Sequence, residues 1–314
     1  MEIIKKLNFE NDIIFIDGIW GTGKSILGPI ISGMYNVEKF KIEYIYEFIC
    51  SLNKLGKISE DSAIWLLRTY ADMSQYNNLI SREVNFRMKD DSGFINNPNK
   101  LKSLLRLFKN DGDENIDSIN ENNIALNLMS HMLLLSPEPL KKAYGKRFKI
   151  IEVVRHPLYI INHWESYLKR FDSSREFTPS FYKNNIKVPW WASEFTDEYI
   201  NYDNFNRTLL SVVICYNQIF DSSNSSFESE NNLLFVSFES LVMSPQKELN
   251  KISSFLNRAH APNINRILKK QKIPRKYLNS GLGHSSYGWK KNLSNEEEFL
   301  ISQKSKINNY GDKE

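Results

Sequence analysis

Residues 18–25 (GIWGTGKS) fit the pattern G-x-x-x-x-G-K-[ST] at every fixed position. Glycines let the chain turn tightly with its backbone N–H groups pointing inward, and a following helix adds about half a positive charge at the same point. Lys24 would supply a point charge for an outer phosphate, and the hydroxyl of Ser25 would hold an oxygen or a metal. The pattern predicts a phosphate-binding loop with a nucleotide as ligand rather than a turn without one. The expected ligand-binding residues are Gly18, Trp20, Gly21, Thr22, Gly23, Lys24 and Ser25.

The chemistry that follows binding depends on what the neighbouring strands carry. Proteins that hydrolyse ATP or GTP commonly place an acidic residue at the end of another strand, where it holds Mg²⁺. Here the apolar run 149–154 continues into Arg155, and the run 233–237 continues into Phe238. Glu152 lies inside its strand rather than at its end. We therefore expect no metal, although the full match of the loop keeps an ATP-dependent kinase as an alternative.

Three kinds of side chain outside the loop are suited to chemistry. Arg155 directly follows a buried strand, where ligands bind in α/β proteins, and its planar guanidinium suits a phosphate; the alternative is a surface ion pair. His131 ends another predicted strand and is a candidate general base, unless it is only a buried histidine between methionines. Carboxylates of the long helical segment are alternative bases, among them Glu43, Glu47 and Glu83.

The elements around these residues alternate between strands and helices. We expect strands over 13–17, 124–131, 149–154 and 233–237, and helices over 23–34, 138–144, 158–171, 204–220 and 245–256. Residues 38–97 have a mostly helical pattern, 110–123 and 221–232 have the composition of loops, and 173–203 has an irregular, aromatic-rich pattern. The order predicts an α/β fold of three layers, with a central parallel sheet and helices on both faces. We expect one domain over 1–314, with a largely helical insertion over 38–123 after the first strand–helix unit.

Composition excludes several classes of protein. Of 314 residues, 41% are hydrophobic and 25% charged, which is typical of a globular chain, and two cysteines cannot form a disulfide framework. A net charge of +4 is too small to predict nucleic-acid binding. Residues 1–11 lack the apolar core of a signal peptide, and we find no run of about 20 apolar residues that would span a membrane. We expect a cytoplasmic protein.

Four segments together resemble the sulfotransferases that use 3′-phosphoadenosine 5′-phosphosulfate (PAPS). The phosphate loop is the first, in a form closer to Walker A, because Gly21 stands where the family commonly has Lys or Arg. The other three are IIEVVRHP at 150–157, FVSFESL at 235–241 with a following Ser-Pro, and YGWK at 287–290. These look like the family's strand ending in Arg-x-Pro, its Tyr-Glu-Asp-Leu segment and its C-terminal Gly-x-Trp-Lys loop. The resemblance spans most of the chain.

The resemblance also implies roles for single residues. Arg155 would bind the 3′-phosphate of the donor, with His163 at the position of a family serine and Phe238 at that of an adenine-contacting tyrosine. His131 would be the catalytic base, because similar enzymes place a histidine in the strand before the Arg-x-Pro strand. Lys24 would neutralise the leaving phosphate without a metal. The C-terminal residues expected to close over the donor are Gly288, Trp289 and Lys290.

These residues lead to three functional hypotheses. The first is a sulfotransferase that moves a sulfuryl group from PAPS, leaving 3′,5′-adenosine diphosphate, to a hydroxyl or amine of a small-molecule or glycan acceptor. The second is an ATP-dependent kinase with a phosphate loop, and the third is a non-catalytic nucleotide-binding protein. We expect no nucleic-acid or membrane partner and leave homo-oligomerisation open. The pair Trp190 and Trp191 suits either a sugar platform or the core, and the size of these side chains favours the core.

Overall fold

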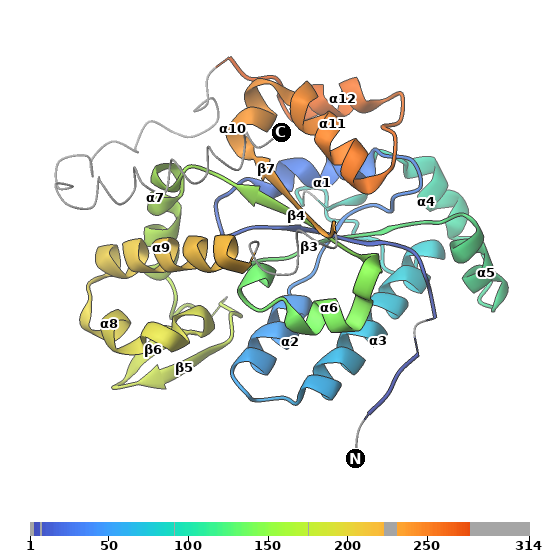
Figure 1. Cartoon of the computed structure of the whole chain (residues 1–314). Coiled ribbons are helices and arrows are strands. Elements are labelled where there is room, and N and C mark those ends of the chain that lie inside the picture. Colours follow the sequence, from blue (N-terminus) through green and yellow to red (C-terminus); the bar gives the residue numbers. More distant parts are fainter. Residues whose placement is uncertain (1–2, 7, 91, 175, 223–230, 277–314) are drawn as a thin grey trace.

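A five-stranded parallel sheet forms the centre of the computed structural model, which describes residues 3–6, 8–90, 92–174, 176–222 and 231–276 (Figure 1). The strands lie in the order β2-β3-β1-β4-β7. They are β1 (Ile13–Asp17), β2 (Lys41–Ile42), β3 (Leu126–Met129), β4 (Phe148–Val154) and β7 (Leu233–Ser237). Because every pair is parallel, the carboxyl ends of all strands meet at one edge. The segments that follow β1, β3 and β4 are therefore neighbours in space.

Helices cover both faces of the sheet, and side chains of β1 alternate between two cores (Figure 1). Ile14 and Ile16 pack in the core that holds residues of α1 (Lys24–Ser32), α10 (Phe238–Met243), α11 (Pro245–Leu256) and α12 (Ile264–Lys270). Ile13 and Phe15 pack in the core that holds residues of α2 (Ile45–Lys54), α3 (Glu60–Leu79), α6 (Glu138–Tyr144), α7 (Pro157–Leu168) and α9 (Asn204–Ser222). The predicted α/β fold with a central parallel sheet is confirmed.

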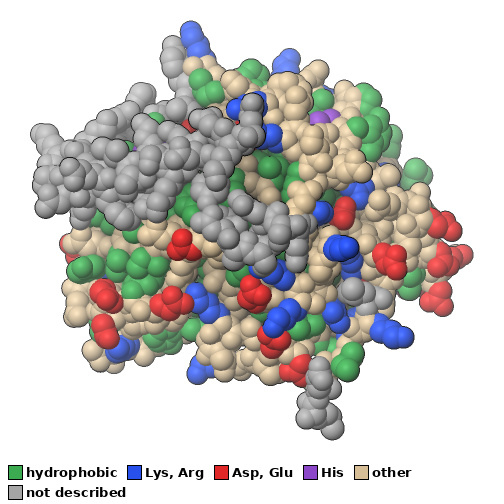
Figure 2. Space-filling model, viewed as in Figure 1, with side chains coloured by type: hydrophobic (Ala, Val, Ile, Leu, Met, Phe, Trp, Pro, Cys, Tyr) green, Lys and Arg blue, Asp and Glu red, His purple; other side chains and the backbone are tan. Residues whose placement is uncertain are grey.

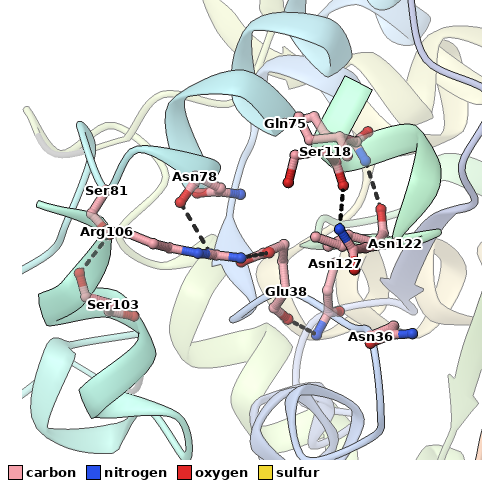
Figure 3. Close-up of polar contacts among 12 residues, drawn as sticks. Asn36, Glu38, Gln75, Asn78, Ser81, Ser103, Arg106, Ser118, Asn122 and Asn127 are labelled. Atoms are coloured by element: carbon pink, nitrogen blue, oxygen red, sulfur yellow. Dashed lines mark hydrogen bonds and ion pairs between the residues drawn. The ribbon is translucent and has the colours of Figure 1, made fainter. Parts of the chain in front are cut away.

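The segment 38–123 contains α2, α3, α4 (Lys100–Arg106), α5 (Glu114–Glu121) and the short edge strand β2. A buried ion pair connects α4 of this segment to the residues before β2. Arg106, at the end of α4, donates two hydrogen bonds of 2.7 Å to the carboxylate of Glu38 (Figure 3). The side-chain amide of Asn127 on β3 in turn donates to the carbonyl of Glu38 at 3.3 Å. The predicted helical content of this insertion is observed.

Two predictions about local structure are wrong. The stretch 110–123, read as an exposed loop, contains α5, because Ile119 on this polar helix is buried against Phe9, Leu79 and Ile124. The stretch 173–203, read as irregular, contains a hairpin of β5 (Ser180–Lys183) and β6 (Ile186–Pro189), the 3-10 helix Trp190–Phe195, and α8 (Thr196–Asn201). Asn184 and Asn185 both have positive φ, 51° and 61°, as a two-residue hairpin turn requires.

Charged side chains of both signs are distributed over the surface seen in Figure 2. Acidic side chains gather at the edge over α5, and basic and acidic side chains intermix elsewhere on the described part of this face. In the described ranges, no helix is both long and apolar enough to cross a membrane.

Candidate functional site

The phosphate loop connects β1 to α1 at the carboxyl edge of the sheet. Gly18, Gly21 and Gly23 have φ of 142°, 85° and 89°, values that side chains other than glycine rarely adopt. The hydroxyl of Thr22 donates to the carbonyl of Ile19 at 2.9 Å and is fully buried, so it closes the loop on itself. Ser25 lies half-buried in the first turn of α1. The loop is therefore held in shape before any ligand arrives.

The ammonium group of Lys24 lies inside this loop. It donates hydrogen bonds to the carbonyls of Gly18 and Ile19, the latter at 3.0 Å. Burial lowers the pKa of Lys24 to about 8, although Asp17 and Glu152 oppose the shift. Because carbonyls are weaker partners for an ammonium than phosphate oxygens are, this cation is suited to turn toward a bound phosphate.

Two carboxyl groups lie below Lys24, on neighbouring strands. Asp17 ends β1 and is paired in register with Glu152 of β4, and both are fully buried. Asp17 accepts a 2.6 Å hydrogen bond from the backbone N–H of Leu133, and burial raises its pKa to about 6. Burial and the charge of Asp17 raise the pKa of Glu152 well above its usual range. Both carboxyl groups act on the charge of Lys24 and oppose the lowering of its pKa.

Arg155 follows β4 and reaches the phosphate loop. Its Nη1 donates to the carbonyl of Gly21 at 3.0 Å, while its buried Nε has no hydrogen-bond partner among the described residues. The guanidinium carbon lies 4.3 Å from the centroid of the Phe238 ring, and that of Arg275 lies 5.5 Å from the same centroid. Two cations thus flank one ring beside the loop. Arg275 was not predicted from the sequence, since nothing in the sequence ties it to the loop.

Phe238 and His163 occupy different positions relative to the loop. Phe238 is only 3% exposed, and a Cβ atom at Gly23 would lie 2.3 Å from its ring. The ring therefore packs directly against the loop backbone. His163 lies on the exposed side of α7, where its ring is the nearest group to a Cβ atom built at Gly21, at 3.3 Å. Burial and the charge of Lys24 lower the pKa of His163.

A cavity of about 400 Å³ opens beside the loop. Its described lining consists of Trp20, Tyr44, Glu47, Phe48, His131, Tyr167, Glu176, Phe177 and Thr178. Trp20 belongs to the phosphate loop itself, so the loop forms one wall of the cavity. The Trp20 ring is held between neighbours: its centroid lies 4.1 Å from that of Tyr167 and 4.7 Å from that of Trp191. Trp164 donates from Nε1 to the carbonyl of Trp20 at 2.8 Å.

His131 lies in this cavity, two residues beyond the end of β3. Its ring stacks on Tyr44, with centroids 5.3 Å apart, and its Nδ1 is buried without a hydrogen-bond partner among the described residues. Burial and the charge of Lys24 lower its pKa well below the usual value. The imidazole is therefore neutral at pH 7 and can accept a proton.

The structure separates the three alternative carboxylate bases. Glu47 of α2 lines the cavity and accepts a 2.9 Å hydrogen bond from Nε1 of Trp190, while burial raises its pKa to about 8. Glu43 and Glu83 instead form ion pairs with Lys41. Trp190 and Trp191 are each 1% exposed, which confirms that they belong to the core, and Trp190 also positions Glu47.

The predicted donor-closing residues Gly288, Trp289 and Lys290 lie outside the described residues. The remaining predicted residues gather around the loop at one edge of the sheet. The grouping divides into a charged half, with Lys24, Arg155 and Arg275, and an aromatic half, with Trp20 and His131. Such an arrangement can hold an anionic ligand beside a second, largely apolar molecule.

The chain was also compared with known proteins. No protein-family model and no curated protein sequence matches it. Among solved structures it is similar to the sulfotransferase domain from the curacin biosynthetic pathway, with 14% identity, a TM-score of 0.49, and coverage of 95% of this chain and 98% of that one. It is also similar to the sulfotransferase domain of the Synechococcus PCC 7002 olefin synthase, with 13% identity, a TM-score of 0.43, and coverage of 86% and 82%. A sulfotransferase from Alicyclobacillus acidocaldarius gives 14% identity, a TM-score of 0.38, and coverage of 86% and 92%.

Proposed function

We propose that this protein is a sulfotransferase that moves a sulfuryl group from PAPS to a hydroxyl or amine of a small-molecule or glycan acceptor. In this proposal the loop from Gly18 to Ser25 binds the 5′-phosphosulfate end of the donor. Arg155, with Arg275 beside it, binds the 3′-phosphate. The aromatic cavity holds the acceptor.

The observation that carries the proposal is the position of Arg155. Its Nη1 contacts the carbonyl of Gly21, so the guanidinium lies at the phosphate loop itself, while its Nε has no partner among the described residues. A second guanidinium, of Arg275, lies near the same Phe238 ring. Two guanidinium groups against one ring beside a phosphate loop favour a ligand with a second phosphate group, because guanidinium donors suit phosphate oxygens.

The residues fit a transfer in line from donor to acceptor. PAPS supplies the sulfuryl group: its sulfur–oxygen bond to the phosphate breaks as a bond from sulfur to the acceptor oxygen or nitrogen forms. His131, neutral at pH 7, takes the acceptor proton. Lys24 and the N–H groups at the start of α1 stabilise the negative charge that remains on the phosphate.

The kinase alternative makes a different demand on the carboxyl groups. Three carboxyl groups act on the charge of Lys24. Asp17 and Glu152 are fully buried beneath the loop, and Glu47, on the cavity side, has a pKa raised to about 8 by burial and is mostly protonated at pH 7. Asp17 already accepts from the N–H of Leu133. A magnesium ion that bridges nucleotide phosphates needs a carboxylate or a water shell on the ligand side of the loop. The burial of Asp17 and Glu152 and the protonation of Glu47 therefore favour the metal-independent reaction.

Thermal unfolding in the presence of nucleotides tests the proposal. A ligand that binds only the folded chain raises the melting temperature according to its affinity. We expect 3′,5′-adenosine diphosphate to stabilise the protein without Mg²⁺, and ADP, which lacks the 3′-phosphate, to stabilise it less. Stabilisation by ATP with Mg²⁺ and none by the 3′,5′-bisphosphate would overturn the proposal in favour of a kinase. Binding without transfer to any acceptor would instead favour the non-catalytic alternative.

A further inference from the structure

We propose that the cavity beside Trp20 selects acceptors with a flat apolar ring and no negative charge, and that it prefers those with a cationic group. This inference rests on the proposed function, because it treats the cavity as the acceptor site. It goes further in naming the chemical class of the acceptor, and it is carried by the side chains of the cavity lining.

Aromatic rings supply most of the cavity wall. They come from four separate segments: Trp20 from the phosphate loop, Tyr44 and Phe48 from the start of α2, Tyr167 from α7, and Phe177 from the segment before β5. Tyr44 and Phe177 are 46% and 73% exposed, so the apolar wall continues to the mouth. Ring faces pack well against a flat apolar molecule, and their negative quadrupole attracts a cation.

The charged side chains in the lining have one sign. Glu47 and Glu176 line the cavity, and its described lining contains neither Lys nor Arg. Glu176 is half-buried and accepts a 2.8 Å hydrogen bond from the backbone N–H of Thr178, which fixes one of its oxygens beside the cavity. Glu47 is more deeply buried than Glu176, and its carboxyl group accepts a hydrogen bond from Nε1 of Trp190.

Among the described residues, the other titratable groups around the cavity do not offset these carboxyl groups. His131, which follows β3, is neutral at pH 7 because its pKa is lowered. Burial raises the pKa of Tyr44 and Tyr167, so both phenols stay neutral as well. Lys24 belongs to the phosphate loop and donates to two of its carbonyls, on the side where the donor's negative charge would lie. Glu47 is mostly protonated at pH 7, so Glu176 is the carboxylate that acts on the acceptor's charge.

The consequence is a filter on the acceptor's charge. A carboxylate or sulfate on the acceptor would lose hydration in an aromatic cavity and would face Glu176 without a described cation to pair with it. An ammonium group would be attracted by Glu176 and by the rings. A phenol or other ring hydroxyl with an amine at the opposite end therefore fits best, whereas acidic glycans are excluded.

Three probes of the same size test this filter by calorimetry on the full chain, in the presence of saturating 3′,5′-adenosine diphosphate. Tyramine, tyrosol and 4-hydroxyphenylacetate share a phenol ring and differ in a terminal ammonium, hydroxyl or carboxylate. We expect affinity to fall in that order, with tyramine at least about tenfold tighter than the carboxylate. Equal or tighter binding of 4-hydroxyphenylacetate, or no binding of tyramine and tyrosol, would overturn the inference.

Variants of Glu176 test whether this residue causes the dependence of affinity on the charge of the acceptor. Glu176→Gln should remove most of the preference for tyramine over tyrosol, and Glu176→Lys should make 4-hydroxyphenylacetate the tightest of the three. Glu198→Gln on α8 is the matched control, since Glu198 is exposed and does not line the cavity. An unchanged order of affinities in Glu176→Lys would contradict the proposed role of this residue.

The failure of this inference can be told apart from failure of the proposed function. If the bisphosphate binds and the affinities of the three probes do not depend on their charge, the proposed donor site stands and the proposed acceptor class is wrong. To cover the opposite case, the titrations are repeated without nucleotide. If tyramine, tyrosol and 4-hydroxyphenylacetate then bind in the expected order while the bisphosphate fails to bind, the cavity selects by charge but the protein is not a PAPS-dependent enzyme.

Discussion

The guanidinium of Arg155 stacks on the ring of Phe238 at 4.3 Å, and the same ring fills the space that a side chain at Gly23 would need. Arg155 also donates to the carbonyl of Gly21. One aromatic ring therefore links the end of β4 to the phosphate loop, which follows β1. The loop and the cation expected to read the 3′-phosphate are held as one unit, and changes to either are expected to affect the other.

Gly23→Ala should damage the loop far more than an ordinary glycine substitution. The new Cβ atom would lie 2.3 Å from the Phe238 ring, and the backbone at this position has a φ of 89°. Left-handed backbone costs about 1–2 kcal/mol for alanine, and overpacking adds about 1–3 kcal/mol. Gly56→Ala is the matched control, because Gly56 also has positive φ but nothing lies within 4 Å of its Cβ position. Chemical denaturation should show the larger loss of unfolding free energy in Gly23→Ala, together with loss of bisphosphate binding; equal losses would contradict this account.

Arg155→Lys should weaken the 3′,5′-bisphosphate more than ADP. Lysine keeps the charge but loses the fork that donates to Gly21 and to a phosphate at once. We expect a loss of about tenfold or more in bisphosphate affinity, and a smaller loss of the same kind in Arg275→Lys, as measured by titration calorimetry. Arg87→Lys, at an exposed position away from the loop, is the control. Equal weakening of ADP and bisphosphate would mean that Arg155 only braces the loop.

Glu47→Gln should change how stability depends on pH. Burial raises the folded-state pKa of Glu47 from 4.5 to about 8. The folded chain thus binds a proton that the unfolded chain releases, so this contribution is complete below pH 4.5 and is lost as the pH rises toward 8. The glutamine keeps an oxygen to accept from Trp190 and cannot ionise. The variant should therefore gain stability relative to wild type between pH 5 and 8, measured by denaturation at several pH values, while Glu198→Gln should follow the wild type.

His131→Gln should lower the rate of transfer without loss of acceptor binding. A positioned base contributes about 10²–10⁴-fold to such a step. Burial and the charge of Lys24 lower the pKa of His131, so its imidazole is neutral at pH 7. The measurement is transfer of labelled sulfate from PAPS to tyramine at saturating acceptor. Comparable loss in Glu47→Gln with full activity in His131→Gln would instead assign the base to Glu47.

The parts of the fold that were predicted correctly depend on local signals. The apolar run of β1 is followed directly by the glycine-rich loop and then by α1, and this order of residues is a local signal for a strand, a phosphate loop and a helix. α5 was missed because Ile116 and Ile119 are its apolar residues, too few for a periodic pattern, and tertiary contacts with Phe9 stabilise it. The β5–β6 hairpin could have been found, since Asn184-Asn185 is a turn signal between alternating residues.

The part of the candidate site around the phosphate loop was predictable from the sequence, and the part around the aromatic cavity was less so. The loop and Arg155 follow strands directly, so the parallel sheet alone brings them together. The sequence could not show which of Glu43, Glu47 and Glu83 lies at the site, because all three fall in one predicted helical region. Only the folded chain places Glu47 beside Trp190 in the cavity wall and pairs the other two with Lys41. Glu176 and Arg275 lie in segments without a motif, and only the folded chain places them at the site.

Trp20 takes part in both halves of the site. Its backbone belongs to the phosphate loop, while its indole, fixed by Tyr167 and Trp191, is a wall of the cavity. A ligand bound at the phosphate loop and a ligand bound in the cavity would both lie against Trp20. Whatever factor the nucleotide imposes on acceptor affinity, the acceptor must therefore impose on nucleotide affinity, since the two free energies close a cycle. Substitution at Trp20 would weaken this coupling, so that the affinity for each ligand would become the same with and without the other.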